Sequence, residues 1–213
     1  ALTERWMFYG WCFAQGPGAA YGFLVFLLLL GGIQLAASEA LGSAEAYRLA
    51  TGVIYAELPA SGEWWRLLSA PLVHVSVAHW ATNTMVGAGV LLVYGPVLGL
   101  RCLVVIALAA PVSFAVTLAA SEVVVFEGQG IIGISGGIAG LMGCMLVANL
   151  RYPESFPQHF AVVTAFVSAS TLFTVSMFLN SASLIAHLGG FLVGAALGCS
   201  ADPVSPRFHA PDA

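Results

Sequence analysis

The chain carries very little charge. Only 8% of its 213 residues are charged, it contains no Lys, and its six basic residues are all Arg. A soluble domain of this length needs more charged side chains than this to solvate its surface. The formal net charge is −4, and no basic cluster of the kind that binds nucleic acid is present in the sequence. We therefore expect neither a soluble protein nor a nucleic-acid partner.

Cysteine is also scarce. Cys12, Cys102, Cys144 and Cys199 are far apart in the chain. Their spacing supports neither a disulfide framework nor a metal cluster. Isolated cysteines in or beside apolar runs are typical of small core residues. We expect no metal and no cofactor.

Apolar residues are abundant instead: 60% of the chain is hydrophobic, and the mean hydropathy is +0.94. A helix needs about 20 mostly apolar residues to cross the hydrocarbon core of a bilayer. The sequence predicts an all-α membrane protein with six transmembrane helices. The six apolar runs are 20–38, 78–98, 102–121, 131–149, 160–179 and 183–200.

Three other segments flank or interrupt these runs. Residues 1–19 are rich in aromatic side chains and predict an interfacial segment. Residues 39–77 form a long first loop, whose moderately apolar pieces predict short interfacial helices. Residues 201–213 are rich in Pro and Asp and predict a disordered tail. The expected organisation is therefore a six-span domain over residues 20–200 between two short terminal segments.

Arginine placement predicts the orientation. Six spans put both termini on one side, and cytoplasmic loops carry the excess of Arg and Lys. We expect a multi-pass protein of a bacterial inner membrane, with both termini cytoplasmic. The terminal side carries Arg5, Arg101, Arg151 and Arg207, and the opposite side carries Arg48 and Arg66 together with Glu122 and Glu127.

Ser135 lies in Gly133-Ile134-Ser135-Gly136, at the start of the fourth apolar run. In the predicted topology this run enters from the outer face, which places Ser135 about one helical turn below that surface. His187 has a similar depth in the sixth run. His79 and Asn83 have it in the second run, four residues apart on one stripe. Four polar groups are thus predicted to lie at one depth.

These groups suit nucleophilic catalysis. A serine hydroxyl needs a base to take its proton, and His187 is suited to that role. Runs 131–149 and 183–200 contain no carboxylate, so a Ser-His dyad is predicted rather than a triad. The backbone N–H of Ser135 and the side chains of His79 and Asn83 are candidate donors to a tetrahedral oxyanion.

Glycine spacing explains how the dyad forms. Small residues at a spacing of four let two membrane helices approach closely. We therefore expect the fourth and sixth runs to pack tightly and to bring Ser135 to His187. The sixth run has Gly190, Gly194 and Gly198, and the fourth has Gly136, Gly140 and Gly143.

Other interpretations compete with this one. In a Gly-rich membrane chain, Gly-x-Ser-Gly is more often a helix contact than a nucleophile motif. A zinc site from His74, His79 and His187 is disfavoured, because no His-Glu-x-x-His pair accompanies it. A channel or transporter is disfavoured, because neither inverted repeats nor paired charges within spans are found. We interpret His74 as structural, holding the long loop down.

Four motifs in order resemble the rhomboid family of intramembrane serine proteases, over roughly residues 63–199. The motifs are Trp65-Arg66 in the first loop, His74-x4-His79-x3-Asn83 at the second span, Gly133-x-Ser135-Gly136, and His187-x2-Gly190-x3-Gly194. The resemblance implies a six-span fold and a Ser135–His187 dyad, with His79 and Asn83 serving the oxyanion. It also implies cleavage of transmembrane protein substrates near their outer ends, within the lipid bilayer.

The chain departs from the family pattern at two places. Many members carry a Tyr four residues after the nucleophile, where this chain has Ala139, so His187 must be oriented otherwise. Many carry a Glu late in the second span, where this chain reads Tyr94-Gly95-Pro96-Val97. Two alternatives stay open: a non-catalytic rhomboid-like protein that binds transmembrane segments, and a sortase-like rhomboid branch that trims C-terminal anchors.

Overall fold

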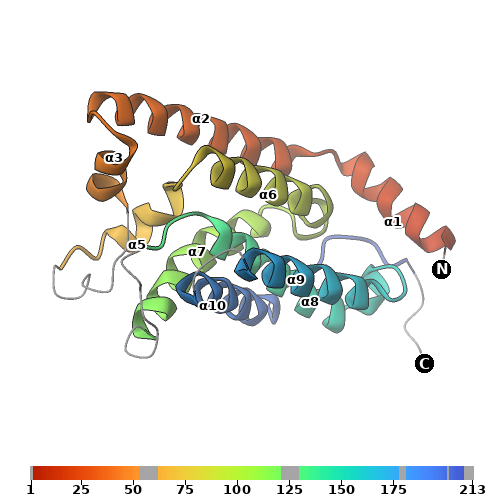
Figure 1. Ribbon diagram of the computed structural model, residues 1–213. Coiled ribbons are helices and arrows are strands. Elements are labelled where there is room, and N and C mark those ends of the chain that lie inside the picture. Colours follow the sequence, from red (N-terminus) through yellow and green to blue (C-terminus); the bar gives the residue numbers. More distant parts are fainter. Residues whose placement is uncertain (1, 53–61, 121–129, 178–180, 201, 209–213) are drawn as a thin grey trace.

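The computed structural model describes residues 2–52, 62–120, 130–177, 181–200 and 202–208, with no side chains described over 172–183. The described elements are all helices (Figure 1). In chain order they are α1 (Leu2–Gln15), α2 (Gly18–Ala40), α3 (Ala44–Thr51), α5 (Arg66–Ser69), η1 (Ala70–Leu72), α6 (Val77–Leu98), α7 (Arg101–Ala119), α8 (Ser135–Arg151), η2 (Pro153–Ser155), α9 (Phe160–Met177) and α10 (Ser181–Gly198).

Six of these helices fall on the six predicted apolar runs: α2, α6, α7, α8, α9 and α10. Within the described ranges, α2, α6 and α7 are each long and apolar enough to cross a membrane. The prediction of an all-α membrane protein is confirmed. The number of crossings and the orientation stay predictions. Glu122 and Glu127, which were assigned to the outer side, lie outside the described residues.

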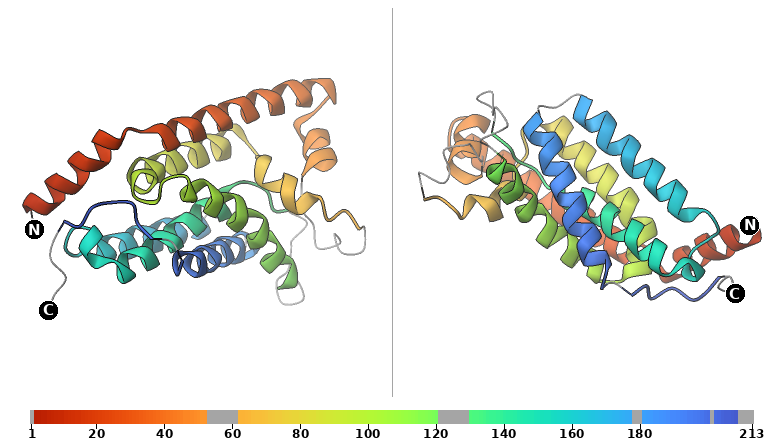
Figure 2. Two further views of the ribbon diagram at one scale, coloured as in Figure 1. Left: turned by 180° about the vertical axis from the view of Figure 1, so that it is seen from behind. Right: turned by 90° about the horizontal axis from the view of Figure 1, so that it is seen from below.

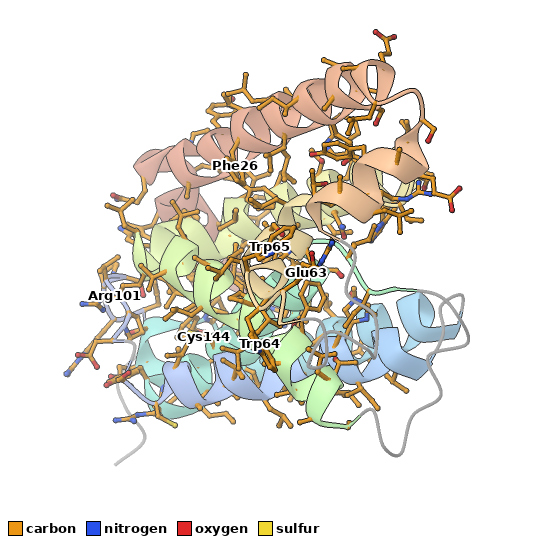
Figure 3. The ribbon with its side chains drawn as sticks, turned by 90° about the vertical axis from the view of Figure 1, so that its left-hand side faces the viewer. Phe26, Glu63, Trp64, Trp65, Arg101 and Cys144 are labelled. Atoms are coloured by element: carbon orange, nitrogen blue, oxygen red, sulfur yellow. The ribbon has the colours of Figure 1, made fainter. Side chains whose placement is uncertain are left out.

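The first loop contains the short helices α3, α5 and η1. Arg66 connects two of them: its Nη1 donates to the Leu49 carbonyl at 2.8 Å, and its Nε pairs with Glu63 at 3.0 Å. The Arg66 guanidinium also stacks on the Trp65 ring, 4.6 Å from its centroid. Figure 3 shows Glu63 and Trp65 beside α5. The Trp-Arg motif therefore fastens α5 to the end of α3.

The helix at the centre of the fold is α8. From Gly136 to Met145 every residue is buried, whereas α2 buries only Ala20, Phe23 and Leu27. Small side chains make this possible, because neighbouring helices can approach α8 along several faces. On the α7 side, a Cβ at Gly137 would lie 2.7 Å from the Ile106 carbonyl oxygen. The central position of α8 matters because Ser135 is its first residue.

The C-terminal segment differs from the sequence prediction. We predicted disorder from residue 201 onward, yet residues 202–208 lie against the helices near the end of α6. The Val204 N–H donates to the Val97 carbonyl at 2.8 Å, and the Phe208 ring lies 5.4 Å from the Phe8 ring. The last turn of a helix has free carbonyls, and Val97 is in the last turn of α6. Composition does not reveal such a backbone contact.

Candidate active site

Ser135 is placed by a turn that only glycine adopts easily. Gly133 has φ +109°, a region that residues with a Cβ rarely enter. Its N–H donates to the Ala70 carbonyl at 2.9 Å, which joins the turn to η1. Helix α8 then starts at Ser135. The first N–H groups of a helix lack acceptors within the helix, so this end attracts negative charge.

His187 faces Ser135 from α10. Its Nε2 lies 2.8 Å from Ser135 Oγ, although the two residues are 52 positions apart in the chain. The His187 side chain is only 4% exposed, and Ser135 is partly buried. This distance is that of a hydrogen bond between a serine nucleophile and its base. The structure thus brings together the two residues that were predicted to form the dyad.

Glycine contacts hold the two helices at this distance. A Cβ at Gly190 would overlap the Gly136 carbonyl oxygen, and one at Gly194 would overlap the carbonyl oxygen of Gly140. Further along, a Cβ at Gly198 would lie 2.6 Å from the Cys144 carbonyl oxygen. The backbones of α8 and α10 therefore touch directly, in the manner of small-residue interfaces between membrane helices.

His79 and Asn83, both on α6, lie beside the Gly133 turn. Ser76 caps α6, its Oγ accepting from the His79 N–H at 3.1 Å, which fixes His79 in the first turn. One turn on, Asn83 Nδ2 lies 3.1 Å from His79 Nε2. A Cβ at Gly133 would lie 2.7 Å from His79 Cε1 and 3.4 Å from Asn83 Nδ2. The pair therefore packs against the turn that precedes Ser135.

His74 lies in the segment that leads into α6. Its backbone is held at both ends by one side chain, because Gln34 Oε1 accepts its N–H at 3.0 Å and Gln34 Nε2 donates to its carbonyl at 2.7 Å. Its ring is 1% exposed, and its centroid lies 5.4 Å from that of His79. Sequence reasoning missed Gln34. A single amide side chain inside the apolar run 20–38 was the available signal.

One nitrogen of His187 has no partner. Its Nδ1 is buried without a hydrogen bond from any described residue. In a Ser-His-Asp triad a carboxylate would hold this nitrogen. Ala139, which stands where many rhomboids have a Tyr, is buried at 3% exposure. Within the part of the chain that the structure describes, the His187 ring is therefore oriented by the packing of α10 and by its bond to Ser135, and not by a hydrogen bond at Nδ1.

A groove of about 310 Å³ lies between α6 and α9. Its wall consists mostly of valine and small residues, including Gly89, Val90, Val163 and Val167. Tyr9 of α1 also contributes to the lining. Grouped metal ligands, meaning three or more His, Cys, Asp or Glu side chains, are not found among the described residues. The groove starts at Met85, beyond Asn83 along α6, and none of its lining residues belongs to the Ser–His pair or to the amide–imidazole pair.

The candidate site thus holds a Ser–His pair and an amide–imidazole pair in a helical membrane protein. A family model described as Rhomboid domain matches residues 61–201. The chain belongs to the rhomboid family, as its four motifs predicted.

The chain is also similar to the Rhomboid protease GluP of Bacillus subtilis (strain 168). The two are 33% identical over 148 residues, which are 66% of this chain and 27% of GluP. The match thus spans about a quarter of the relative's length.

Proposed function

We propose that this protein is an intramembrane serine endopeptidase that cleaves transmembrane protein substrates through a Ser135–His187 dyad. The observation that carries the proposal is the 2.8 Å contact between Ser135 Oγ and His187 Nε2 at the start of α8. Membership of the rhomboid family and similarity to a protein named as a rhomboid protease support it.

The reaction begins with acylation. His187 Nε2 takes the hydroxyl proton as Ser135 Oγ attacks the scissile carbonyl carbon. The oxyanion is met by the Ser135 N–H and by the side chains of His79 and Asn83. His187 then gives its proton to the leaving amine as the C–N bond breaks. An acyl-enzyme on Ser135 and a free amine result.

Deacylation repeats these steps with water. His187 takes a proton from the attacking water, and the new oxyanion forms at the same donors. When the bond from carbon to Ser135 Oγ breaks, His187 returns the proton to the serine. No residue outside the site described above is needed for either half-reaction.

The substrate helix docks beside α6 and α9, with its body along the apolar groove and its outer end at the level of Ser135 and His187. Its helix-breaking or small residues near the outer end let it unwind there, and its freed backbone groups need polar partners in lipid. The polar site supplies these partners, while the valine-rich wall suits an apolar helix. We further propose that both termini are cytoplasmic and that the site faces outward in a bacterial inner membrane.

The test is cleavage of a model transmembrane substrate by the purified protein. We expect Ser135→Ala to lower kcat by roughly 10⁴-fold or more, as in other serine hydrolases. His187→Asn should have a comparable effect. Exposed residues supply matched controls: Ser200→Ala and His159→Asn should cleave at the wild-type rate. A fluorophosphonate should label the wild type at Ser135 and leave Ser135→Ala unlabelled.

Other outcomes would select the alternatives. If all variants cleave equally, the dyad is wrong. If the wild type retains a transmembrane segment without cleaving it, the protein is a non-catalytic rhomboid-like binder. If only substrates with a C-terminal transmembrane anchor are cut, it belongs with the sortase-like branch. The masses of the products distinguish this last case from general endoproteolysis.

A further inference from the structure

Two exposed arginines meet at the end of the bundle that is opposite Ser135. Arg101 is the first residue of α7, and Arg151 is the last residue of α8. Each of them donates to a carbonyl of the stretch that follows α10: Arg101 Nη1 to Asp202, and Arg151 Nη1 to Cys199. The two guanidiniums, which come from different helices, therefore lie against the same short stretch of chain.

Neither guanidinium is neutralised by a carboxylate. Among the described residues, no carboxylate oxygen lies within ion-pair distance of Arg101 or Arg151. The carboxylate of Asp202 accepts from the Tyr152 hydroxyl instead, so the cluster of two arginines and one aspartate keeps an excess of positive charge. A guanidinium has five N–H donors, and only one of each donates to the carbonyls above. Both side chains therefore have donors left for an anion.

This cluster lies at the level where the hydrocarbon core of a membrane ends. Helix α7, which is long and apolar enough to cross a membrane, begins at Arg101, and α6 ends close by at Leu98. A strongly exposed leucine precedes each arginine in the chain: Leu100 is 77% exposed and Leu150 is 64% exposed. Leucines with this exposure suit contact with acyl chains, whereas arginine heads reach for the headgroup region. The two arginines thus lie where lipid phosphates are found.

An apolar stripe on α7 leads up to this cluster. Val104, Leu108 and Val112 follow Arg101 three, seven and eleven residues further on, a spacing that places them on one face of the helix. They are 56%, 47% and 40% exposed, so the described residues do not cover this face. An acyl chain along the stripe would bring its phosphate to the level of Arg101. The stripe and the arginines match the two chemically different ends of a phospholipid.

We propose that Arg101 and Arg151 bind the phosphate of an anionic phospholipid, whose acyl chains lie along the Val104–Leu108–Val112 face of α7. Arginine suits phosphate because its fork of N–H groups can donate to two oxygens at once. An anionic lipid is favoured over a zwitterionic one, because a choline or ethanolamine head would bring a further cation to the two arginines. Binding does not depend on the proposed function, since no residue of the candidate active site takes part.

A purely structural role is the competing explanation. Both arginines donate to carbonyls near the C-terminal end of α10, where a helix favours positive charge. A glutamine can donate to the same carbonyls without carrying a charge, so Arg→Gln substitutions separate the two explanations. Arg207 supplies the matched control, because it is an exposed arginine near the same end of the bundle and already pairs with Glu154.

The first experiment measures thermal unfolding of the purified chain in a neutral detergent, with added dioleoylphosphatidylglycerol or dioleoylphosphatidylcholine. We expect phosphatidylglycerol to raise the melting temperature of the wild type and phosphatidylcholine to leave it unchanged. In Arg101→Gln and in Arg151→Gln, the phosphatidylglycerol concentration at half of this rise should be about fivefold higher. Arg207→Gln should respond as the wild type does.

The outcomes that overturn the proposal are specific. They are a wild type that phosphatidylglycerol does not stabilise, a response that both glutamine variants retain in full, and an equal loss of response in Arg207→Gln. The last outcome would mean general attraction to a negative surface. Inorganic phosphate at matched ionic strength identifies the source of the anion: it lacks acyl chains and should give no rise. An equal rise with inorganic phosphate would contradict a lipid site.

A second measurement keeps the test valid if a glutamine variant folds poorly. Arg101→Lys and Arg151→Lys keep the charge, and lysine still binds phosphate as a point charge. Mass spectrometry of the intact protein, released from detergent with equal amounts of the two lipids, counts the lipids that stay bound. We expect the wild type and the lysine variants to retain phosphatidylglycerol in preference to phosphatidylcholine. Equal retention of the two lipids by the wild type would contradict a site for anionic lipid.

Discussion

Two sides of the bundle are built differently. Between α8 and α10 the backbones touch, because glycines face carbonyl oxygens at Gly190 and Gly194. Between α6 and α9 lies a groove of about 310 Å³. In the view from below, the axes of these two helices have nearly the same slope (Figure 2). On the close side, the packing of α8 on α10 keeps Ser135 Oγ 2.8 Å from His187 Nε2. On the open side, the groove is lined mainly by apolar side chains. If the protein acts as proposed, the close side fixes the dyad and the open side faces the substrate helix.

Among changes outside the Ser135–His187 pair, the largest effect is expected from a side chain added to the close side. In Gly194→Val, the new Cβ would overlap the Gly140 carbonyl oxygen and push α10 from α8. We expect at least about a 10²-fold loss of kcat, since a displacement of roughly 1 Å of a catalytic group has that cost. The melting temperature should also fall. Cleavage rate and thermal unfolding in detergent measure both effects.

Gly32→Val is the matched control for this change. Gly32 lies on an exposed face of α2, and a Cβ there would meet nothing within 4 Å. Its activity and melting temperature should equal those of the wild type. Equal losses in the two variants would mean that valine itself, and not the α8–α10 contact, disturbs the fold.

The same substitution on the open side should act on binding. A Cβ at Gly89 also meets nothing within 4 Å, but Gly89 lines the groove. We expect Gly89→Val to raise KM for a transmembrane substrate about tenfold, or about 1.4 kcal/mol, without changing kcat. Labelling by a small fluorophosphonate should keep its wild-type rate. Slower labelling would show that the substitution reaches the dyad and that the two sides are not separate.

A smaller effect is expected from the cap of α6. Ser76→Ala removes the acceptor of the His79 N–H, and loss of such a cap costs about 1 kcal/mol of stability. Activity should fall with it, because His79 sits on this first turn and contacts Asn83 on the next. Ser43→Ala removes the equivalent cap of α3, where Ser43 Oγ accepts from Ala46 N–H at 3.0 Å. We expect a similar loss of stability there with full activity.

The smallest effect on activity is expected at the C-terminal segment. The Phe208 ring packs on Phe8, and Phe8 in turn packs on Phe160 of α9 with centroids 5.1 Å apart. Phe208→Ala should lower the melting temperature while kcat and KM stay at wild-type values. A change in KM would show that this aromatic cluster restrains the groove as well as the Phe160 end of α9. Arg101, which bonds to the Asp202 carbonyl and projects beside this segment, is labelled in Figure 3.

Much of the fold could be predicted because the length of an apolar run is a property of the local sequence. Each predicted apolar run coincides with a helix to within a few residues; the run at 78–98, for example, is α6 at Val77–Leu98. The start of α8 was less well predicted. The run begins at 131, but the Gly133 turn delays the helix until Ser135. Hydropathy carries no information about the backbone φ angle, so it does not predict this turn.

Contacts between segments that are distant in the sequence could not be predicted, because hydropathy describes only neighbouring residues. The amide of Gln34 binds the backbone of His74, 40 residues further along, and neither position predicts the other. The composition of the C-terminal segment predicts disorder, yet Phe208 adds its ring to a cluster with Phe8 and Trp11. Such pairings depend on which surfaces meet after folding.

Residue types and their spacing therefore determined the class of this protein and the identity of its candidate nucleophile, base and oxyanion residues. They did so because bilayer thickness and the chemistry of serine and histidine constrain any sequence that uses them. Only the tertiary structure decided how these residues meet. The 2.8 Å contact of Ser135 with His187 results from glycine backbones in direct contact. Burial of one ring nitrogen each in His74, His79 and His187, which have no hydrogen-bond partner there among the described residues, depends on which helices pack around them.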